Sequence, residues 1–424
     1  MQDQLPLLGP AEEEPAAAAP LTAPELIQAL TTFVCDGRRT ERATITTASG
    51  RAVPVLANEF WTSKQRAASS LHEISYRACF KPQLPRFFIS RLTAPMDVVY
   101  DPFMGRGTTV LEAALLGRVP WGCDVNPLSL VLAVPRLTPP TVERVEARLG
   151  AIDFDWRGEV PGDLMAFYHP ATLNEICALR AYLGARTAEG AADAVDRWIQ
   201  MVAVNRLTGH SPGFFSVYTL PPNQALSAGA QRKINADRDQ TPPRRHVPAL
   251  ILAKTRALLS DVTGPVREQL TTTHEAARFH VGSSAAAFWT RDAVDLVVTS
   301  PPFLNVVDYA RDNWLRCWFC GIDPAHVAIA RPGKLDDWRE FIASVFMQLA
   351  RVLKPGGFVA FEVGEVRAGT IRLEESVIPC GEQAELTPVA VVVNSQRFTK
   401  TANIWGVSNN TKGTNTNRIV VFQK

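Results

Sequence analysis

The chain has 424 residues, of which 46% are hydrophobic and 20% charged, and its net charge at pH 7 is +2. This composition is typical of a globular protein and excludes a fibrous or wholly disordered chain, and the length allows two or three domains. No apolar run approaches the roughly 20 residues that a membrane-spanning helix needs, so we expect no membrane partner.

The N-terminal residues lack the basic start and apolar core of a secretory signal. The seven cysteines lie far apart except Cys317 and Cys320. A single C-x-x-C motif without a second pair is a weak metal signal, so we interpret these two as ordinary helix residues and expect no metal. Cysteines left free in this way favour a reducing compartment, and we expect a cytoplasmic protein.

Residues 1–23 are rich in Ala, Pro and Glu and predict a disordered tail. The pattern that follows, up to residue 89, predicts mostly helices. "MDVVYDPF" (96–103) predicts a buried strand that ends at a turn, "GTTVLEAALLGR" (107–118) a helix, and "PWGCDVNP" (120–127) a second strand. A strand, a glycine-rich turn, a helix and a strand in this order predict a right-handed βαβ unit.

The sheet pattern is then interrupted, and residues 136–276 predict a largely helical insert. It resumes with strands at 278–284, 294–300 and 356–364, and two closing strands at 388–395 and 417–424 are expected to pair antiparallel. The sequence therefore predicts an α/β protein with a seven-stranded, mostly parallel sheet that has helices on both faces. The first half of the sheet lies within residues 24–135, together with N-terminal helices, and the second half within 277–424.

The turn "DPFMGRGTT" (101–109) indicates a nucleotide-type ligand, because Gly105 and Gly107 allow a tight turn and a close backbone approach. Asp124 ends the next strand, where an acid can bind a ribose diol. The turn lacks both the third glycine of a dinucleotide site and the lysine of a phosphate cradle. Asp101 would repel a pyrophosphate but suits an ammonium group, so S-adenosylmethionine satisfies both acids.

The corner "TSPPF" (299–303) also ends a predicted strand and should face the same crevice. The Ser300 hydroxyl and the Pro301 carbonyl can accept hydrogen bonds from an exocyclic amino group, which returns its lone pair to the nitrogen. Pro301 and Pro302 fix the turn without competing N–H donors. Phe303 offers a face on which an extruded base can stack, which would return about 1–3 kcal/mol.

Together, "DPFMGRGTT" and the later "TSPPF" resemble the paired motifs of S-adenosylmethionine-dependent DNA methyltransferases that act on cytosine N4 or adenine N6. "FKPQLPRFFISRL" (80–92) is similar to the N-terminal cofactor motif of that family, and the resemblance covers about 70–135 and 276–424. It implies a Rossmann-like methyltransferase fold with Ser300, Pro301, Pro302 and Phe303 as catalytic residues. The cofactor-binding residues that it implies are Phe80, Lys81, Pro82, Asp101, Pro102, Phe103, Gly105, Gly107, Thr108, Thr109, Asp124, Asn126 and Ser283. Ser283 stands where the family usually has an acid.

In this family a serine at the first position of the four-residue motif goes mostly with cytosine N4, so we favour that target. Adenine N6, an RNA substrate, and a non-catalytic DNA-binding relative remain alternatives. The expected partners are double-stranded DNA and a companion restriction endonuclease. The stretch from Arg206 to Arg256 carries eight basic against two acidic residues, which makes the insert the candidate for target recognition. The proposed DNA contacts are Arg232, Lys233, Arg244 and Arg245. Phe214, Phe215 and Tyr218 are either wedges for the DNA or core residues.

Overall fold

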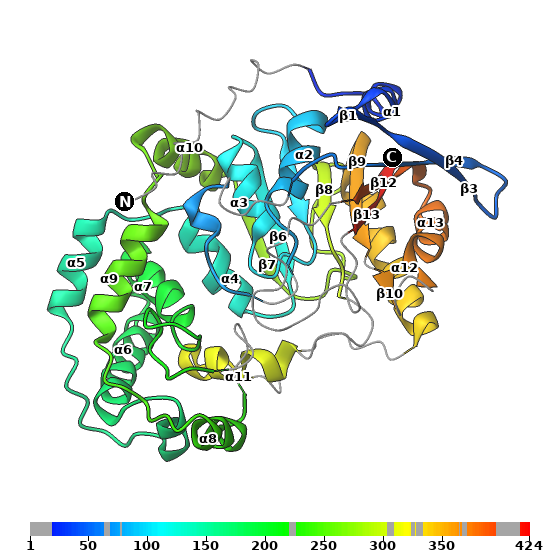
Figure 1. Ribbon diagram of the computed structural model, residues 1–424. Helices are drawn as coiled ribbons and strands as arrows, with labels where there is room; N and C mark the ends of the chain where they lie inside the picture. Colours follow the sequence, from blue (N-terminus) through cyan, green and yellow to red (C-terminus); the bar gives the residue numbers. More distant parts are fainter. Residues whose placement is uncertain are drawn as a thin grey trace, which may run out of the picture.

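The computed structural model describes residues 19–62, 68–76, 79–219, 226–302, 309–323, 327, 334–363, 365–366, 371–395 and 416–424. A nine-stranded sheet forms the centre of the molecule, with a helical unit beside it (Figure 1). The order of the strands across the sheet is β3-β4-β12-β13-β9-β8-β5-β6-β7. Their bounds are β3 Glu41–Thr46, β4 Ala52–Asn58, β5 Val98–Asp101, β6 Val119–Asp124, β7 Arg278–Val281, β8 Val294–Thr299, β9 Leu353–Val363, β12 Thr387–Ser395 and β13 Thr416–Gln423.

The sheet contains all seven strands that the sequence predicts, and the α/β fold class is confirmed. Strands β7, β6, β5, β8 and β9 run parallel to one another. β13 is antiparallel to both β9 and β12, so the expected antiparallel closing pair is also confirmed. Two small antiparallel pairs lie outside the main sheet, namely β1 (Val34–Cys35) with β2 (Arg38–Arg39) and β10 (Glu365–Val366) with β11 (Ile371–Arg372).

The prediction of mostly helices between residues 24 and 89 is wrong for the hairpin of β3 and β4. This hairpin adds two strands to the edge of the sheet, where β4 lies parallel to β12. Its sequences, "ERATIT" and "AVPVLAN", contain β-branched residues that suit a pleated surface. The turn between the strands includes Gly50, whose φ of +81° lies in the left-handed region that favours glycine.

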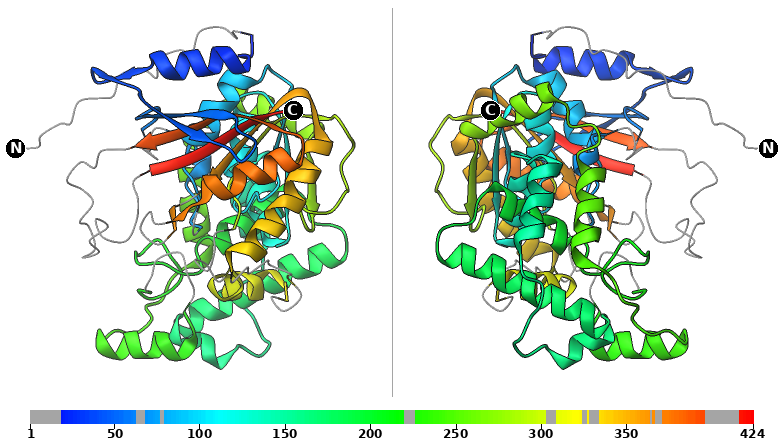
Figure 2. Two further views of the ribbon diagram at one scale, coloured as in Figure 1. Left: turned by 90° about the vertical axis from the view of Figure 1, so that its right-hand side faces the viewer. Right: turned by 90° about the vertical axis from the view of Figure 1, so that its left-hand side faces the viewer.

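Helices cover both faces of the sheet (Figures 1 and 2). Alternate residues of β8 pack on opposite faces, as the two-residue period of a strand requires. Val298 belongs to a core with helices α1 and α2, whereas Val297 belongs to a core with α12 and α13. The bounds of the helices near the sheet are α1 Ala23–Thr32, α2 Gln83–Leu92, α3 Thr108–Leu115, α4 Leu128–Ala133, α12 Leu335–Val352 and α13 Leu373–Gln383.

The insert is helical, as expected, and forms the helical unit at the left of Figure 1. Its core is continuous with residues of α3 and α4, and α11 from the second half of the chain also contributes to it. The bounds are α5 Val142–Ala151, α6 Pro170–Ala188, α7 Ala194–Val204, α8 Ala228–Asp237, α9 Val247–Leu258, α10 Gly264–Glu275 and α11 Tyr309–Cys320, with short 3-10 turns η2 Ser70–His72, η3 Val134–Arg136 and η4 Gly162–Ala166. Of the helices described, none is long and apolar enough to cross a membrane.

Candidate active site

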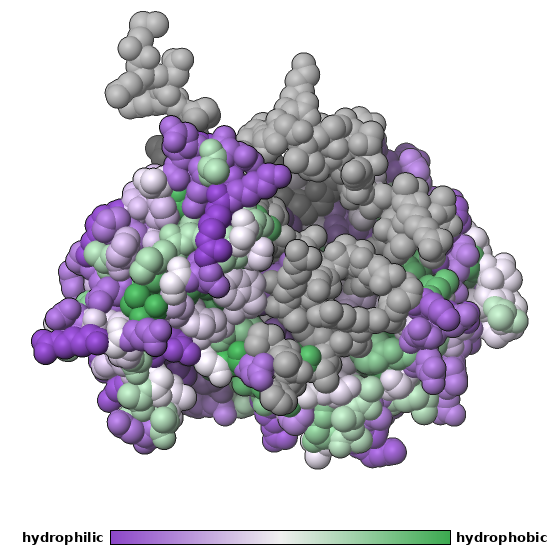
Figure 3. Space-filling model, turned by 90° about the horizontal axis from the view of Figure 1, so that it is seen from below, coloured by the Kyte–Doolittle hydropathy of each residue, from purple (hydrophilic) through white to green (hydrophobic). Residues whose placement is uncertain are grey.

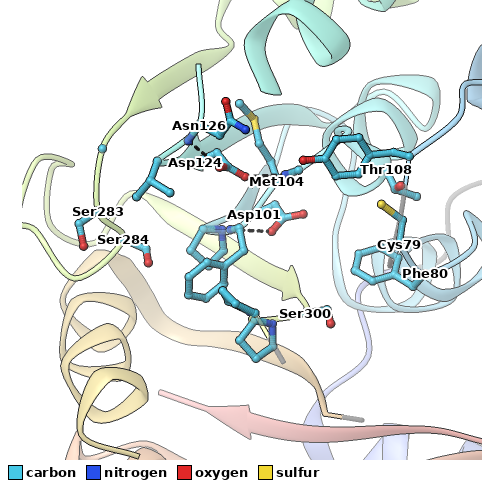
Figure 4. A pocket seen from close by; sticks show the side chains of 18 of the residues that line it. Cys79, Phe80, Asp101, Met104, Thr108, Asp124, Asn126, Ser283, Ser284 and Ser300 are labelled. Atoms are coloured by element: carbon cyan, nitrogen blue, oxygen red, sulfur yellow. Dashed lines mark hydrogen bonds between the residues drawn. The ribbon is translucent and has the colours of Figure 1, made fainter. Parts of the chain in front are cut away.

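The carboxyl ends of β5, β6 and β8 meet at one edge of the sheet, which is where ligands bind in open α/β sheets. A pocket of about 300 Å³ lies there. It is lined by residues of both corners that the sequence singles out, the turn that begins at Asp101 and Ser300, Pro301 and Pro302 of the corner at 299–303 (Figure 4). The predicted site residues that line it are Phe80, Asp101, Pro102, Phe103, Gly105, Thr108, Asp124, Asn126, Ser283, Ser300, Pro301 and Pro302.

Asp101 joins the two corners directly. Its Oδ1 atom accepts hydrogen bonds from the hydroxyl of Thr299, at 2.6 Å, and from the backbone N–H of Phe103, at 3.0 Å. The side chain is buried, and no cation is among the main influences on its titration. Burial raises its pKa to about 7, against the opposing effect of the hydrogen bonds and with a further increase from the charge of Asp124. A cationic ligand group in the pocket would therefore stabilise the ionised form.

Asp124 shapes the glycine turn from the neighbouring strand. Its Oδ2 accepts a hydrogen bond from the N–H of Gly105, at 2.8 Å, and its Oδ1 from the N–H of Asn126, at 2.9 Å. Burial raises the pKa of this carboxyl as well. Gly105 has a φ of +50°, and a Cβ built on it would meet no heavy atom closer than 3.8 Å. The glycine therefore leaves open space on the pocket side of the turn.

Four predicted cofactor residues do not line the pocket, namely Lys81, Pro82, Gly107 and Thr109. Gly107 precedes α3 with a φ of +78°, and a Cβ there would lie 2.6 Å from the Cβ of Ala133, so this glycine permits the close approach of α4. Thr109 is fully buried, and its hydroxyl donates a hydrogen bond to the carbonyl of Val298. Gly107 and Thr109 therefore stabilise the loop through packing and hydrogen bonding without lining the pocket.

Phe303, the predicted stacking residue, lies outside the described residues. Ser300 lies beside Glu362, a buried residue near the end of β9 that the sequence analysis missed, because the register pairs the preceding residues Thr299 and Phe361. The carboxylate of Glu362 accepts a hydrogen bond from the side-chain amide of Asn417 on β13. Burial raises its pKa to about 7, and the neighbouring polar side chains of Asn417 and Ser300 oppose this increase. A single acid inside an apolar strand leaves little sequence signal, since its partners come from distant strands.

The segment before α2 supplies two further pocket residues, Tyr76 and Cys79, that no sequence motif singles out. Buried arginines bind its backbone. The guanidinium of Arg106, in the glycine turn, donates to the carbonyls of Ile74 and Phe80, and that of Arg316 on α11 donates to the carbonyl of Ser75. These hydrogen bonds connect this wall of the pocket to the glycine turn and to the helical unit.

The four predicted DNA contacts lie on the helical unit, which presents many hydrophilic side chains at the left of the face seen from below (Figure 3). Arg232 and Lys233 are exposed on α8. Arg232 forms an ion pair with Asp163, and Arg244 forms one with Glu175. Arg245, just before α9, receives a hydrogen bond at its carbonyl and donates one from its N–H, both with Thr172.

The other questions left open by the sequence concern Phe214, Phe215 and the cysteine pair. Phe215 is fully buried and Phe214 is 9% exposed, so both are packed residues in this structure. Cys317 is buried on α11 and Cys320 lies one turn later. Within the described ranges there is no group of three or more His, Cys, Asp or Glu side chains that could hold a metal ion.

A mostly parallel sheet with a pocket at its carboxyl edge is the arrangement in which α/β proteins bind nucleotide-type ligands. Residues 42–133, which include the glycine turn, match a family model described as DNA methylase. Over that segment the chain is similar to this family, and the resemblance expected from the sequence motifs is confirmed there.

Two curated relatives match a segment of similar length. The chain is 30% identical over 92 residues to the Type II methyltransferase M.MjaII of Methanocaldococcus jannaschii, covering 22% of this chain and 17% of the relative. It is 29% identical over 97 residues to the Type II methyltransferase M.MvaI of Kocuria varians, covering 22% and 20%. The matched region therefore spans only about a fifth of the length of either relative.

Solved structures resemble the chain more loosely. The rRNA methyltransferase aviRa from Streptomyces viridochromogenes has a TM-score of 0.33 at 12% identity, covering 86% of this chain and 94% of its own. TrmN from Thermus thermophilus has a TM-score of 0.30 at 14% identity, covering 82% and 50%. TTHA0409 from the same organism, described as a putative DNA modification methylase complexed with S-adenosyl-L-methionine, has a TM-score of 0.21 at 18% identity, covering 32% and 50%. The fold assignment rests on the strand order of the sheet itself.

Proposed function

We propose that this protein is a DNA methyltransferase that uses S-adenosylmethionine to methylate the exocyclic N4 of a cytosine turned out of the double helix. The observation that carries this proposal is the shared pocket, which is lined both by the glycine turn from Asp101 and by the target corner "TSPPF" from Ser300. Behind it, the buried Thr299 hydroxyl donates a hydrogen bond to Asp101 at 2.6 Å and connects the two. The family match over residues 42–133 and the Type II methyltransferases among the relatives support it.

The residues of the pocket suit the two ends of S-adenosylmethionine. The buried Asp101 carboxyl would bind its ammonium group, because an adjacent cation favours the ionised form that burial disfavours. Asp124 has carboxylate lone pairs left for a ribose diol, beyond the two amides that it binds. The open space at Gly105 admits ligand atoms close to the backbone. When bound, the cofactor supplies an activated methyl group on a sulfonium.

The target corner would act on the amino group by position and hydrogen bonding. The Ser300 hydroxyl and the Pro301 carbonyl both belong to residues that line the pocket, and both can accept from an amino group. Such acceptors draw the nitrogen lone pair out of the aromatic ring and fix it for attack. The enzyme requires no covalent intermediate for this step. The serine in the motif favours cytosine N4 over adenine N6, which remains the alternative target.

We assign target recognition to the helical unit, where Lys233 and Arg232 would contact DNA phosphates. A companion restriction endonuclease with the same recognition sequence would fit a Type II methyltransferase. All seven cysteines are free, which supports a reducing compartment such as the cytoplasm.

The decisive experiment is to incubate the protein with S-adenosylmethionine labelled in its methyl group and with unmethylated duplex DNA. The DNA is then digested to nucleosides, and the labelled nucleoside is identified by mass spectrometry. We expect N4-methylcytosine at one short recognition sequence. Label in N6-methyladenine would overturn the choice of base, whereas label transferred only to a competing RNA would overturn the choice of polymer.

A further inference from the structure

An arginine is stacked on a tyrosine at the end of helix α8, in the helical unit. The Cζ atom of Arg238 lies 4.0 Å from the centre of the Tyr218 ring, so the flat guanidinium covers one face of the ring. Arg238 is exposed, and Tyr218 is half-buried. Within the described ranges Arg238 forms no ion pair, whereas Arg232 on the same helix is paired with Asp163.

The backbone of Tyr218 is fixed against α8. Its carbonyl accepts hydrogen bonds from the side-chain amides of Gln231, at 3.0 Å, and Gln240, at 3.1 Å. Both amides also donate to the side-chain oxygen of Asn235, each at 2.8 Å. Gln231 is fully buried. The tyrosine ring therefore has a defined position relative to the helix that carries the arginine.

The end of α8 defines the position of Arg238 in the same way. Arg238 is the last half-helical residue, and Asp239 follows with a φ of +46°, in the left-handed region that aspartate tolerates better than most residues. The N–H groups of Asp239 and Gln240 donate to the carbonyls of Ala236 and Asn235. These are the two hydrogen bonds of a Schellman motif, which ends a helix at a fixed residue.

A second arginine in the same region shows what a stack used only for packing looks like. The Cζ atom of Arg206 lies 4.1 Å from the centre of the Phe214 ring, and Phe214 is buried. Burial lowers the pKa of Arg206 to about 10, and its Nε donates to the carbonyl of Asn205. The guanidinium of Arg238, in contrast, is at the surface, and no group of the described chain binds its N–H edge.

The stack lies toward the side of the molecule on which the pocket opens. Helix α8 is at the lower end in Figures 1 and 2, and β10, which follows the carboxyl end of β9, is below β9 in Figure 1. The loop that carries Tyr218 begins at Asn205, whose side chain accepts a hydrogen bond from the N–H of Ser75 at 2.9 Å, next to the pocket residue Tyr76. A duplex that delivers a base to the pocket would therefore pass on the side where α8 lies.

We propose that Arg238, held on the ring of Tyr218, reads a guanine of the DNA recognition sequence. This inference deepens the proposed function and rests on it. Guanine presents the acceptors O6 and N7 in the major groove, and an arginine binds both through two N–H groups at once. Stacking restricts the guanidinium before the DNA arrives and leaves that edge free, so less conformational freedom is lost on binding.

The charges beside Arg238 favour a base over a phosphate as its partner. Asp237 and Asp239 flank it in the sequence, and both are exposed. Their carboxylates would repel a phosphate, whereas the edge of a guanine carries no net charge. Lys233, one and a half turns earlier on α8, has no acid next to it in the sequence and remains the candidate for a phosphate contact.

The test first defines the recognition sequence. The full-length protein methylates unmodified genomic DNA, and single-molecule sequencing locates the modified bases. Duplexes with that sequence are then made in which single guanines are replaced by 7-deazaguanine, which lacks N7, or by inosine, which keeps both O6 and N7. Single-turnover methyl transfer gives the rate for each duplex with the wild type and each variant.

For the wild type we expect one guanine at which 7-deazaguanine lowers the rate about 10-fold and inosine does not. Arg238→Gln should not respond to 7-deazaguanine at that position and should lose about 10–100-fold of its discrimination against other base pairs there. Arg238→Lys should also lose this discrimination, because lysine keeps the charge but cannot form the paired contact.

Three further variants separate the stack from general effects. Tyr218→Leu should lose part of the discrimination at this guanine, and Tyr218→Phe, which keeps the ring, should restore most of it. Arg144→Gln is the matched control, since Arg144 on α5 is exposed and forms no ion pair within the described residues, but is not stacked on an aromatic ring. The recognition sequence of this variant should be that of the wild type.

Two results would overturn the role of Arg238 while leaving the proposed function intact. If Arg238→Gln keeps the recognition sequence but binds all DNA more weakly, with a salt slope smaller by about 0.9, the arginine contacts a phosphate. If neither sequence nor affinity changes, the stack belongs to the surface of the fold alone. Should Arg238→Gln not fold, Arg238→Lys and the two Tyr218 variants still decide. Absence of any DNA methylation by the wild type would overturn the proposed function, and this role with it.

Discussion

The pocket and the helical unit differ in the groups that surround their buried carboxylates. In the helical unit, Asp196 is 1% exposed and forms ion pairs with both Arg148 and Arg186. In the pocket Asp101, and beside the pocket Glu362, are also buried, but they accept hydrogen bonds from hydroxyl and amide groups. A buried carboxylate whose ion pairs are formed in the folded chain stabilises the fold. A buried carboxylate without a cation is unfavourable in its ionised form, and binding of a cationic ligand or of a proton removes that cost.

The pKa of Asp193 in the helical unit and that of Asp101 in the pocket shift in opposite directions, which follows from this difference. Burial opposes ionisation of Asp193 too, but hydrogen bonds from Arg148 and from backbone amides lower its pKa to about 2. Asp193 therefore contributes stability above its ordinary pKa of 3.8, and that contribution is lost as the pH falls toward 2. The pKa of Asp101 is raised, so its effect on stability is the reverse. Between about pH 4 and 7 this carboxyl ionises in the unfolded chain before it ionises in the folded chain, and the free energy of unfolding therefore falls as the pH rises. The proposed site thus lies where the folded chain has buried acids without a cationic partner.

The largest effect is expected from breaking the helical unit's ion pairs. Asp196→Ala leaves Arg148 and Arg186 without a shared partner and should lower the free energy of unfolding by about 3–5 kcal/mol. Denaturant titration measures this loss, and the folded fraction should keep its affinity for S-adenosylmethionine. Asp155→Ala is the matched control, since its pair with Arg157 is exposed on both sides and should contribute less than about 1 kcal/mol. Equal losses in the two variants would contradict the comparison.

Asp101→Asn should have the converse outcome. Removing the charge that pairs with the ligand's ammonium should weaken binding of S-adenosylmethionine about 100-fold, or about 2.7 kcal/mol, as measured by calorimetry. In the absence of ligand the variant should melt at a higher temperature than wild type at pH 8, where wild-type Asp101 is ionised, with the difference vanishing near pH 4. A difference in melting temperature that is the same at both pH values would show that the carboxyl does not titrate as the structure indicates.

Ser300→Ala separates the two corners of the pocket. The variant loses one acceptor for the amino group, and loss of a single such contact at a reacting centre costs about 100-fold in rate. Its affinity for S-adenosylmethionine should stay within about twofold of wild type, because the cofactor acids lie on the other strands. Single-turnover transfer and calorimetry measure the two quantities. Full activity in Ser300→Ala would mean that the corner does not act on the amino group.

The sequence was sufficient for features with a local signal. Apolar runs ending at Asp101, Asp124 and Thr299 placed three strand ends correctly, and parallel strands then bring those ends to one edge. The hairpin at 41–58 was missed, because short strands in a stretch with helical spacing produce a mixed period. Glu362 was missed for a different reason, since only the register between β8 and β9 places it beside Ser300. Contacts across strands far apart in the chain leave no spacing to read.

The smallest effects concern basic residues on the surface of the helical unit. There, a residue that forms an ion pair and a residue without one are expected to have different roles. Arg244 binds Glu175, which is largely buried and also accepts from the N–H of Val247 at the start of α9. Lys233 is exposed on α8, and no ion pair to it occurs in the part of the chain that the structure describes. We therefore expect Arg244→Gln to lower the melting temperature more than it lowers DNA affinity.

Lys233→Gln should do the reverse. It should weaken DNA binding only a few-fold at moderate salt, and it should reduce the slope of log affinity against log salt concentration by about 0.9, the value for one phosphate contact. Fluorescence anisotropy at several salt concentrations measures both quantities, with the melting temperature as a check on folding. An unchanged salt slope would place the DNA on another face of the molecule, and Lys233 would then be a solvent-exposed residue of a helix whose role is structural.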